Sequence, residues 1–205
     1  MRLKLCYDVA KGLSALHNCG IIHSDVKSEN ILVCTDAKSG FVAKVADFGF
    51  SLAEAGDGAR LPGGTVPWNA PEWLEWIPTD QLPKTDAYSF GLLVWRVMTK
   101  TKNPFQEKTA NPAPSTNGST EIDALKSSDT RMLHTISSLL RRTMGQAPEC
   151  SPSLEVIQCT VRKDPLSRNL PQAIEILERA MPRELLIPRY KIPPLLRKHI
   201  PLCKG

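Results

Sequence analysis

One run of eight residues constrains this chain more than any other segment does. The run from His23 to Asn30 reads His-Ser-Asp-Val-Lys-Ser-Glu-Asn. An Asp-Phe-Gly tripeptide follows it at Asp47, and an Ala-Pro-Glu tripeptide follows at Ala70. Each block alone is a weak signal, because short motifs arise by chance. Three such blocks in one order, each in a fitting local context, form a specific signal.

The sequence around these blocks predicts the elements that hold them. Apolar residues recur at helical spacing over residues 5–16 and predict a buried helix that ends near Gly20. Two short apolar runs, 31–33 and 41–45, predict a β-hairpin. The hairpin would carry Asn30 on one side and the Asp-Phe-Gly block on the other. The expected order is therefore helix, polar loop, hairpin and Asp-Phe-Gly.

In this order the blocks resemble the catalytic loop, the magnesium loop and the end of the activation segment of eukaryotic protein kinases. The resemblance covers roughly residues 3–179. It implies the mainly α-helical C-terminal lobe of the protein-kinase fold, a truncated part of an α+β family fold, with a small β-hairpin component. Small-molecule phosphotransferases of the aminoglycoside or choline type share a similar loop. They lack the Ala-Pro-Glu block and the helix opening found at Asp86.

The resemblance implies a set of catalytic residues. Asp25 would orient the substrate hydroxyl and accept its proton, and Lys27 would lie beside the γ-phosphate of ATP. Asn30 would bind one Mg²⁺ and Asp47 would bind both metal ions, through hard oxygen ligands. Thr65 would bridge Asp25 and Lys27, and the lysine itself favours a Ser/Thr-specific kinase. The expected cofactors are therefore ATP and Mg²⁺.

Apolar residues beside the motifs would support the site. By position, His23 and Phe48 would belong to one of the two apolar stacks that run between kinase lobes. Leu32 would belong to the other stack and to the cofactor-binding site. Without an N-terminal lobe, the upper members of both stacks would be absent. We therefore expect an exposed apolar surface that a partner protein could cover.

Two further charged positions serve as independent checks. Asp86 opens an apolar helix, and by the resemblance it would bond to the backbone of the catalytic loop. The alternative is an ordinary acidic residue in a first helical turn. Arg168 would form an ion pair with Glu72 and tie the activation segment to the C-terminal helices. The alternative is that Arg168 and Glu72 both lie on the surface.

The chain departs from the family pattern in its catalytic loop. Ser24 occupies the position where many kinases have an arginine that binds a phosphate on the activation segment, and serine cannot make that bidentate contact. Between Asp47 and Glu72 the only Ser or Thr hydroxyls belong to Ser51 and Thr65. We therefore do not expect switching by phosphorylation of this segment.

The larger departure is an absence. The 205 residues contain no Gly-rich phosphate loop and no strand lysine of the Val-Ala-Ile-Lys type. Losing one preorganised charge typically costs about 10²–10³ in rate. We therefore expect this chain alone to bind ATP and Mg²⁺ weakly or not at all and to turn over negligibly, so its status as an enzyme stays open. In its complete form it would transfer the ATP γ-phosphate to Ser or Thr of protein substrates. The alternative is a non-catalytic interaction module, a pseudokinase-like scaffold.

Composition divides the chain into four segments. Residues 1–101 hold every catalytic motif, and residues 102–130 form a Pro/Ser/Thr-rich insertion that we expect to be exposed. Residues 131–180 return to helical periodicity. Residues 181–205 form a Pro-containing tail with six basic residues and one acidic residue. The tail could bind an acidic partner, nucleic acid or an anionic membrane surface, or pack back on the lobe.

Cysteine usage and hydropathy indicate where the protein resides. The six cysteines form no Cys-x-x-Cys pair, and no secretory apolar region opens the chain. Reduced thiols in an intracellular protein, cytoplasmic or nuclear, are the natural interpretation. The longest apolar stretch is far too short to span a bilayer. We expect no transmembrane segment and a protein substrate or partner protein as the binding partner.

Overall fold

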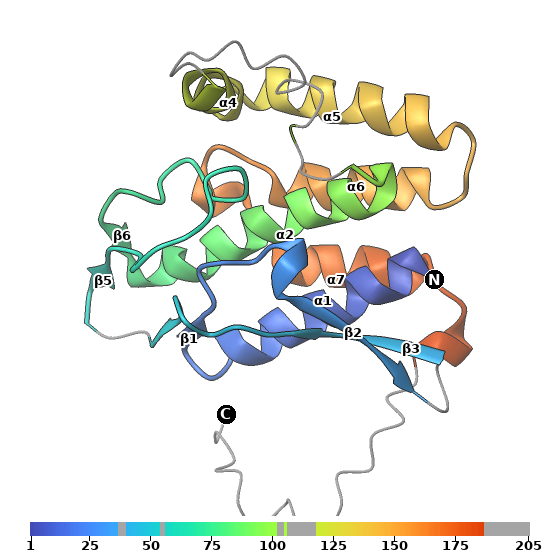
Figure 1. Cartoon of the computed structure of the whole chain (residues 1–205), viewed down its shortest axis with the longest axis horizontal. Helices are drawn as coiled ribbons and strands as arrows, with labels where there is room; N and C mark the ends of the chain where they lie inside the picture. Colours follow the sequence, from blue (N-terminus) through green and yellow to red (C-terminus); the bar gives the residue numbers. More distant parts are fainter. Residues whose placement is uncertain (37–39, 54–55, 102–104, 106–117, 187–205) are drawn as a thin grey trace, which may run out of the picture.

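Helices form most of the computed structural model, which describes residues 1–36, 40–53, 56–101, 105 and 118–186 (Figure 1). The described α-helices are α1 (Arg2–His17), α2 (Leu82–Thr99), α4 (Gly118–Lys126), α5 (Asp129–Met144), α6 (Cys150–Thr160) and α7 (Leu170–Arg179). The strands pair antiparallel, as β1 (Ile21–Ile22) with β4 (Leu52–Ala53), β2 (Ile31–Asp36) with β3 (Gly40–Val45), and β5 (Gly58–Ala59) with β6 (Ile77–Pro78). Short 3₁₀ helices span Ser28–Asn30, Thr79–Gln81, Pro165–Ser167 and Arg183–Leu185. The mainly α-helical fold with a small β component is confirmed.

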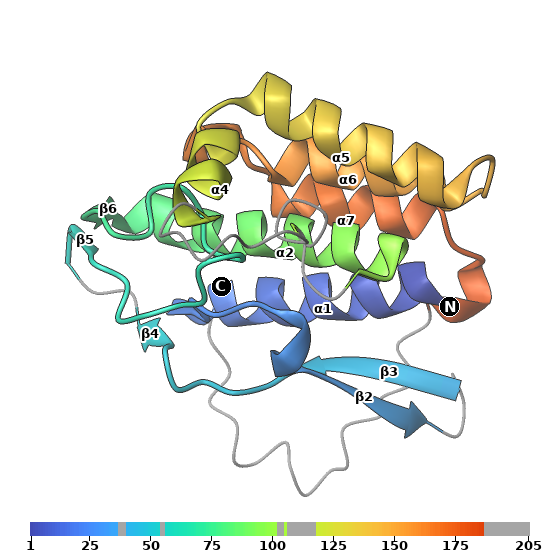
Figure 2. The same cartoon turned by 45° about the horizontal axis from the view of Figure 1, so that its top comes forward.

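Helix α2 forms the centre of the fold. It packs against α1, α5 and α6, and Figure 2 shows it between α1 and the layer of α5 and α6. Every residue from Thr85 to Trp95 is buried, as expected for a helix that is covered on all sides. Gly91 permits the close approach of α6, because a Cβ at this position would collide with the side chains of Thr160 and Val161.

The β2–β3 hairpin lies against α1 at one edge of the helical body (Figures 1 and 2). In its register Ile31 lies opposite Val45. One step beyond this pair, the backbone N–H of Ala46 donates to the carbonyl of Asn30 at 2.9 Å. The hairpin therefore brings Asn30 next to Asp47, as the two apolar runs predict.

The C-terminal helices close the fold against its beginning. Helix α5 buries one face through Met132, Ile136 and Leu140, which recur every four residues. Helix α7 packs against α1, and the Tyr7 hydroxyl donates to Glu178 Oε1 at 2.8 Å. The helical periodicity expected for residues 131–180 therefore corresponds to α5, α6 and α7.

The segment expected to be an exposed insertion differs where the structure describes it. Residues 118–126 form α4, which buries Ile122 and Lys126, and Phe105 is also buried. The remaining positions between 102 and 117 lie outside the described residues, as does the tail from 187 onwards, which includes Cys203. Cys6, Cys34, Cys150 and Cys159 are free thiols. None of the described helices is long and apolar enough to cross a membrane.

Candidate active site

The carboxylate of Asp25 is the centre of a cluster of polar side chains. It is buried and accepts hydrogen bonds from Lys27 Nζ at 2.6 Å and Asn30 Nδ2 at 3.0 Å on Oδ2. The hydroxyl of Thr65 donates to Oδ1 at 2.7 Å. Lys27 Nζ also donates to Thr65 Oγ1 at 2.8 Å, so the threonine bridges the acid and the lysine. The structure thus brings together Asp25, Lys27, Asn30 and Thr65 from two segments far apart in sequence.

Asn30, a member of this cluster, and Asp47 both carry side-chain oxygen atoms of the kind that bind hard cations. The amide nitrogen of Asn30 is committed to Asp25, because it donates to both the backbone carbonyl and the carboxylate of that residue. Asp47 is exposed and has a left-handed backbone with φ of 63°. Its Oδ1 accepts the backbone N–H of Gly49 at 3.2 Å. Among the residues that the structure describes, no three His, Cys, Asp or Glu side chains gather as a metal site.

His23 couples the catalytic loop to the Asp-Phe-Gly segment. Its imidazole is fully buried, and Nδ1 accepts the backbone N–H of Asp25 at 3.3 Å. Nε2 contacts the carbonyl of Ala46 at 3.0 Å, so the two contacts together assign the ring proton to Nε2. The rings of His23 and Phe48 lie edge to face, with centroids 5.4 Å apart.

Asp86, a residue of α2, fixes the backbone of the catalytic loop. Its carboxylate is buried in α2 and accepts the backbone N–H groups of His23 at 2.8 Å and Ser24 at 2.9 Å. His17 Nε2 lies 2.9 Å from the same carboxylate. The alternative of an ordinary first-turn acid is excluded, because α2 begins at Leu82 and Asp86 lies one turn later.

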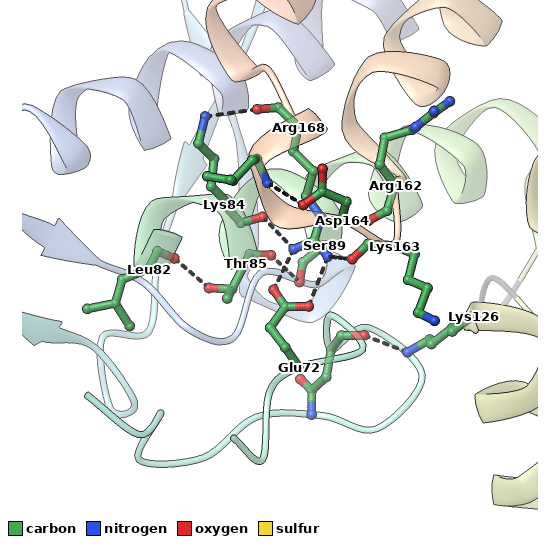
Figure 3. A network of polar contacts seen from close by, with 12 residues as sticks. Glu72, Leu82, Lys84, Thr85, Ser89, Lys126, Arg162, Lys163, Asp164 and Arg168 are labelled. Atoms are coloured by element: carbon green, nitrogen blue, oxygen red, sulfur yellow. Dashed lines mark hydrogen bonds and ion pairs between the residues drawn. The ribbon is translucent and has the colours of Figure 1, made fainter. Parts of the chain in front are cut away.

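An ion pair anchors the end of the activation segment. Arg168 is buried and donates to the Glu72 carboxylate through both terminal nitrogens, at 2.5 and 2.9 Å. Its guanidinium also donates to backbone carbonyls, including that of Arg162 at 2.7 Å (Figure 3). The same guanidinium lies over the Tyr88 ring, with Cζ 4.9 Å from the ring centroid. Burial raises the pKa of the Tyr88 hydroxyl, which stays protonated beneath the guanidinium. The bidentate pair therefore joins the activation segment to the loop before α7.

Large apolar side chains are exposed on the β2–β3 hairpin and at the two phenylalanines that follow Asp47. Leu32 is 54% exposed and Phe48 is 51% exposed. Val33, Phe41 and Phe50 are exposed as well. We call these five residues the apolar surface. Leu93 of α2 is buried and lines a small pocket together with Ile31 and Val33 of the hairpin. Large apolar residues are also exposed elsewhere in the described chain, at Leu74, Trp76 and Leu166.

Sequence reasoning missed two residues that contact this site. His17 bonds Asp86, and its only sequence signal was its position at the polar end of the first helix. Lys126 of α4 bonds the backbone that follows Thr65. A buried lysine whose acceptors are backbone carbonyls has no partner side chain that a motif could reveal. Among the described residues, the buried hydroxyl of Ser24 has no hydrogen-bond partner. The sequence indicated only that Ser24 replaces an arginine and did not predict this unpaired hydroxyl.

Comparisons with known proteins agree with this geometry. The family model for the protein kinase domain matches residues 2–178. Serine/threonine-protein kinase CTR1 of Arabidopsis thaliana is 43% identical over 102 residues, which make up 48% of this chain and 12% of that protein. Dual specificity protein kinase zakA of Dictyostelium discoideum is 40% identical over 106 residues, 47% of this chain and 13% of that protein. Serine/threonine/tyrosine-protein kinase HT1 of Arabidopsis thaliana is 39% identical over 108 residues, 52% of this chain and 26% of that protein. The chain thus matches only a minor part of each of these relatives.

Proposed function

Because this chain belongs to the protein kinase family, we propose that it carries the catalytic-loop half of an enzyme that transfers the ATP γ-phosphate to Ser or Thr hydroxyls of protein substrates. The proposal depends on one observation, the cluster in which the Asp25 carboxylate accepts hydrogen bonds from Lys27, Asn30 and Thr65. Relatives named as serine/threonine and dual specificity kinases support a hydroxyl group as the acceptor. The matched part of those relatives is small, so their substrates are not transferred to this chain.

In this proposal Asp25 is the residue that orients the substrate hydroxyl. Its position is restrained on both oxygens, so the carboxylate cannot rotate freely. A carboxylate near the substrate hydroxyl can orient that hydroxyl so that its oxygen lone pair points at phosphorus. The carboxylate can then accept the hydroxyl proton as the new oxygen–phosphorus bond forms. Lys27 supplies a positive charge on one side of the carboxylate. The positive charge also suits the γ-phosphate, which carries negative charge during transfer.

Two residues fit the binding of Mg²⁺. Asp47 is exposed and Asn30 has its amide nitrogen engaged elsewhere, so a carboxylate oxygen and an amide oxygen are the atoms left for a hard cation. When bound, Mg²⁺ would neutralise charge on the phosphates of ATP. Within the chain itself, the hairpin and the His23–Phe48 contact hold Asn30 and Asp47 at one edge of the catalytic loop.

The proposed partners follow from exposed surfaces. A protein substrate would approach the segment after Thr65, where Val66 is 45% exposed. A second protein segment would cover part of the apolar surface, since exposed Leu, Val and Phe side chains are unfavourable in water. Free thiols support a reducing, intracellular location, and burial raises the pKa of the Cys6 thiol to about 12, which leaves that thiol unreactive.

Binding of Mg·ATP to the 205-residue chain, measured by calorimetry, tests the proposal together with a phosphotransfer assay. We expect a dissociation constant above about 1 mM, beyond the usual range of substrate affinities. Transfer of labelled phosphate to a Ser/Thr-rich acceptor protein should be negligible beside that of a complete kinase, yet measurable above the background of Asp25→Asn over long incubation. Asp47→Asn should abolish the binding, and Asp25→Asn should abolish the transfer but not the binding. Transfer that is equal in the wild type and in Asp25→Asn would overturn the proposal and favour a non-catalytic interaction module.

A further inference from the structure

A lysine at the end of α4 reaches into the activation segment. Lys126 is 5% exposed, and its ammonium donates to the carbonyl of Asn69 at 2.6 Å and to that of Val66 at 3.1 Å. The lysine therefore joins two backbone positions of one short segment to a helix that lies more than 50 residues later in the chain. Figure 3 shows its side chain reaching this loop from α4, at a place separate from the contact between Arg168 and Glu72.

Two aromatic rings stabilise the ammonium where it is buried. Lys126 Nζ lies 5.8 Å from the centroid of the Tyr88 ring and 5.6 Å from that of the Phe105 ring, both within the reach of a cation–π contact. Burial lowers the lysine pKa to about 8, and the charges of Asp123 and Glu72 oppose that decrease. The ammonium is thus held between carbonyl acceptors and aromatic faces rather than in water.

The segment that Lys126 contacts is the turn that begins at Thr65. The carbonyl of Thr65 accepts the backbone N–H groups of Trp68 at 2.8 Å and Asn69 at 3.2 Å. At its start the turn is fastened by the Thr65 hydroxyl to Asp25 and Lys27, and near its end Ser89 Oγ donates to the carbonyl of Trp68 at 2.9 Å. Lys126 bonds the final carbonyl of the turn and the carbonyl next to Thr65. One turn is therefore fixed at the catalytic loop and at α4 together.

We propose that Lys126 is a positioning residue, which holds the turn 65–69 so that the Thr65 hydroxyl bridges Asp25 and Lys27 and the substrate-facing backbone keeps one conformation. The catalytic part of this inference rests on the proposed kinase function; the positional part does not. Lys126 touches neither Asp25 nor Lys27 in the described contacts and acts through the backbone. Removing the ammonium would leave two carbonyls without that donor and free the turn at one end.

Amide hydrogen exchange of the 205-residue chain tests the positional part. In Lys126→Met, which keeps the apolar stem, the amides of Trp68 and Asn69 should exchange about tenfold faster, the change expected for the loss of one hydrogen bond. In Lys126→Arg, which keeps a cationic donor, exchange should stay within about threefold of the wild type. The matched control is Lys163→Met, because Lys163 is exposed and lines the same cavity of about 670 Å³ as Lys126. Exchange in this control should be unchanged.

The same experiment separates positioning from general stabilisation. Amides of α6, such as those of Val156 and Ile157, should exchange at the wild-type rate in Lys126→Met. Uniform acceleration across α6 and the turn, or no acceleration in the turn, would overturn the proposal. If Lys126→Met does not fold, Lys126→Gln is compared with Lys126→Arg instead, since glutamine is neutral and shorter. Equal amide exchange of Trp68 and Asn69 in these two variants would also overturn the proposal.

Phosphotransfer by the same variants separates this inference from the proposed function. Lys126→Met should lower kcat about tenfold and leave the KM for ATP unchanged, and Lys126→Arg should restore most of the rate. Faster exchange in the turn without any transfer by the wild-type chain would support the positioning role and contradict the kinase function. Phosphotransfer by the wild-type chain, together with unchanged amide exchange in Lys126→Met, would support the kinase function and contradict the positioning role.

Discussion

The buried carboxylate of Asp86 accepts the backbone N–H of Ser24 at 2.9 Å, and Ser24 has a left-handed φ of 67°. A non-glycine residue in this region is strained, so it needs external support. The second oxygen of Asp86 accepts the N–H of His23 at 2.8 Å. Helix α2 therefore holds the loop in the conformation that presents Asp25, and it does so with a carboxylate rather than with apolar contacts.

Asp86→Asn should destabilise the chain strongly. The amide group has one acceptor oxygen, so its NH₂ group would face a backbone N–H that now has no acceptor. Loss of a buried, charge-assisted hydrogen bond predicts a decrease of about 2–4 kcal/mol in the free energy of unfolding, measured with urea. Asp80→Asn is the control, because Asp80 is exposed. Equal unfolding midpoints for the two variants would contradict this role of Asp86.

Arg168→Lys should be almost as harmful, although it keeps the charge. A lysine cannot form the two parallel bonds to Glu72, and it leaves several backbone carbonyls without their donor. We expect a loss of about 2–3 kcal/mol in urea unfolding. Arg179→Lys, at an exposed position of α7, should change stability by less than about 0.5 kcal/mol. A similar, small effect of both substitutions would show that the ion pair is not needed for folding.

Thr65→Ala should separate catalysis from folding. It removes the hydroxyl that bridges Asp25 and Lys27, while the backbone bonds of the turn remain. We expect about 10–10² slower phosphotransfer and a change in unfolding free energy of less than about 1 kcal/mol. Thr65→Ser keeps the hydroxyl and should retain most of the rate. If alanine and serine variants transfer phosphate equally fast, the bridge has no catalytic role.

The lowered pKa of Lys126 predicts a pH dependence of stability. Its pKa falls from 10.5 in the unfolded chain to about 8 in the fold. Between these values the unfolded state binds more protons, so the lysine's contribution to stability rises with pH by about 1 kcal/mol per pH unit. Below pH 8 the charge is present in both states and this gain disappears.

To isolate the contribution of Lys126 to stability, the unfolding free energy of Lys126→Met is subtracted from that of the wild type at pH 7.0, 8.5 and 9.5. Groups that face Lys126 are Asp123 on its own helix, Glu72 on the activation segment and Tyr88 on α2. Because burial raises the pKa of Tyr88, this side chain stays neutral in the fold over the measured range. A difference that is constant with pH would contradict the titration of Lys126.

The sequence predicts the parts of this fold whose signals are local. The helix before the catalytic loop, the hairpin between Asn30 and Asp47, and the order of the motif blocks all follow from short-range patterns. The Glu72–Arg168 pair spans 96 positions, and only resemblance to a family suggests it. No spacing rule connects two residues at that separation.

Other features depend on tertiary contacts that no pattern encodes. Helix α4 falls in a segment whose Pro, Ser and Thr content predicts an exposed insertion, yet it buries Lys126. Propensity is a weak prior, and packing against Tyr88 and Phe105 overrides it here. The contact between His17 and Asp86 also could not be predicted from a local pattern, because it depends on where α1 ends relative to α2.

Contacts between the beginning and the end of the chain have a consequence for its covalent continuity. Helix α1 packs on α7, α2 packs on α6, and Arg168 bonds both Glu72 and the carbonyl of Lys84. These contacts, rather than the peptide linkage between α2 and α4, hold the two halves together. These contacts bring residues before α2 and residues after α4 into one core, so the stability of each part depends on the other.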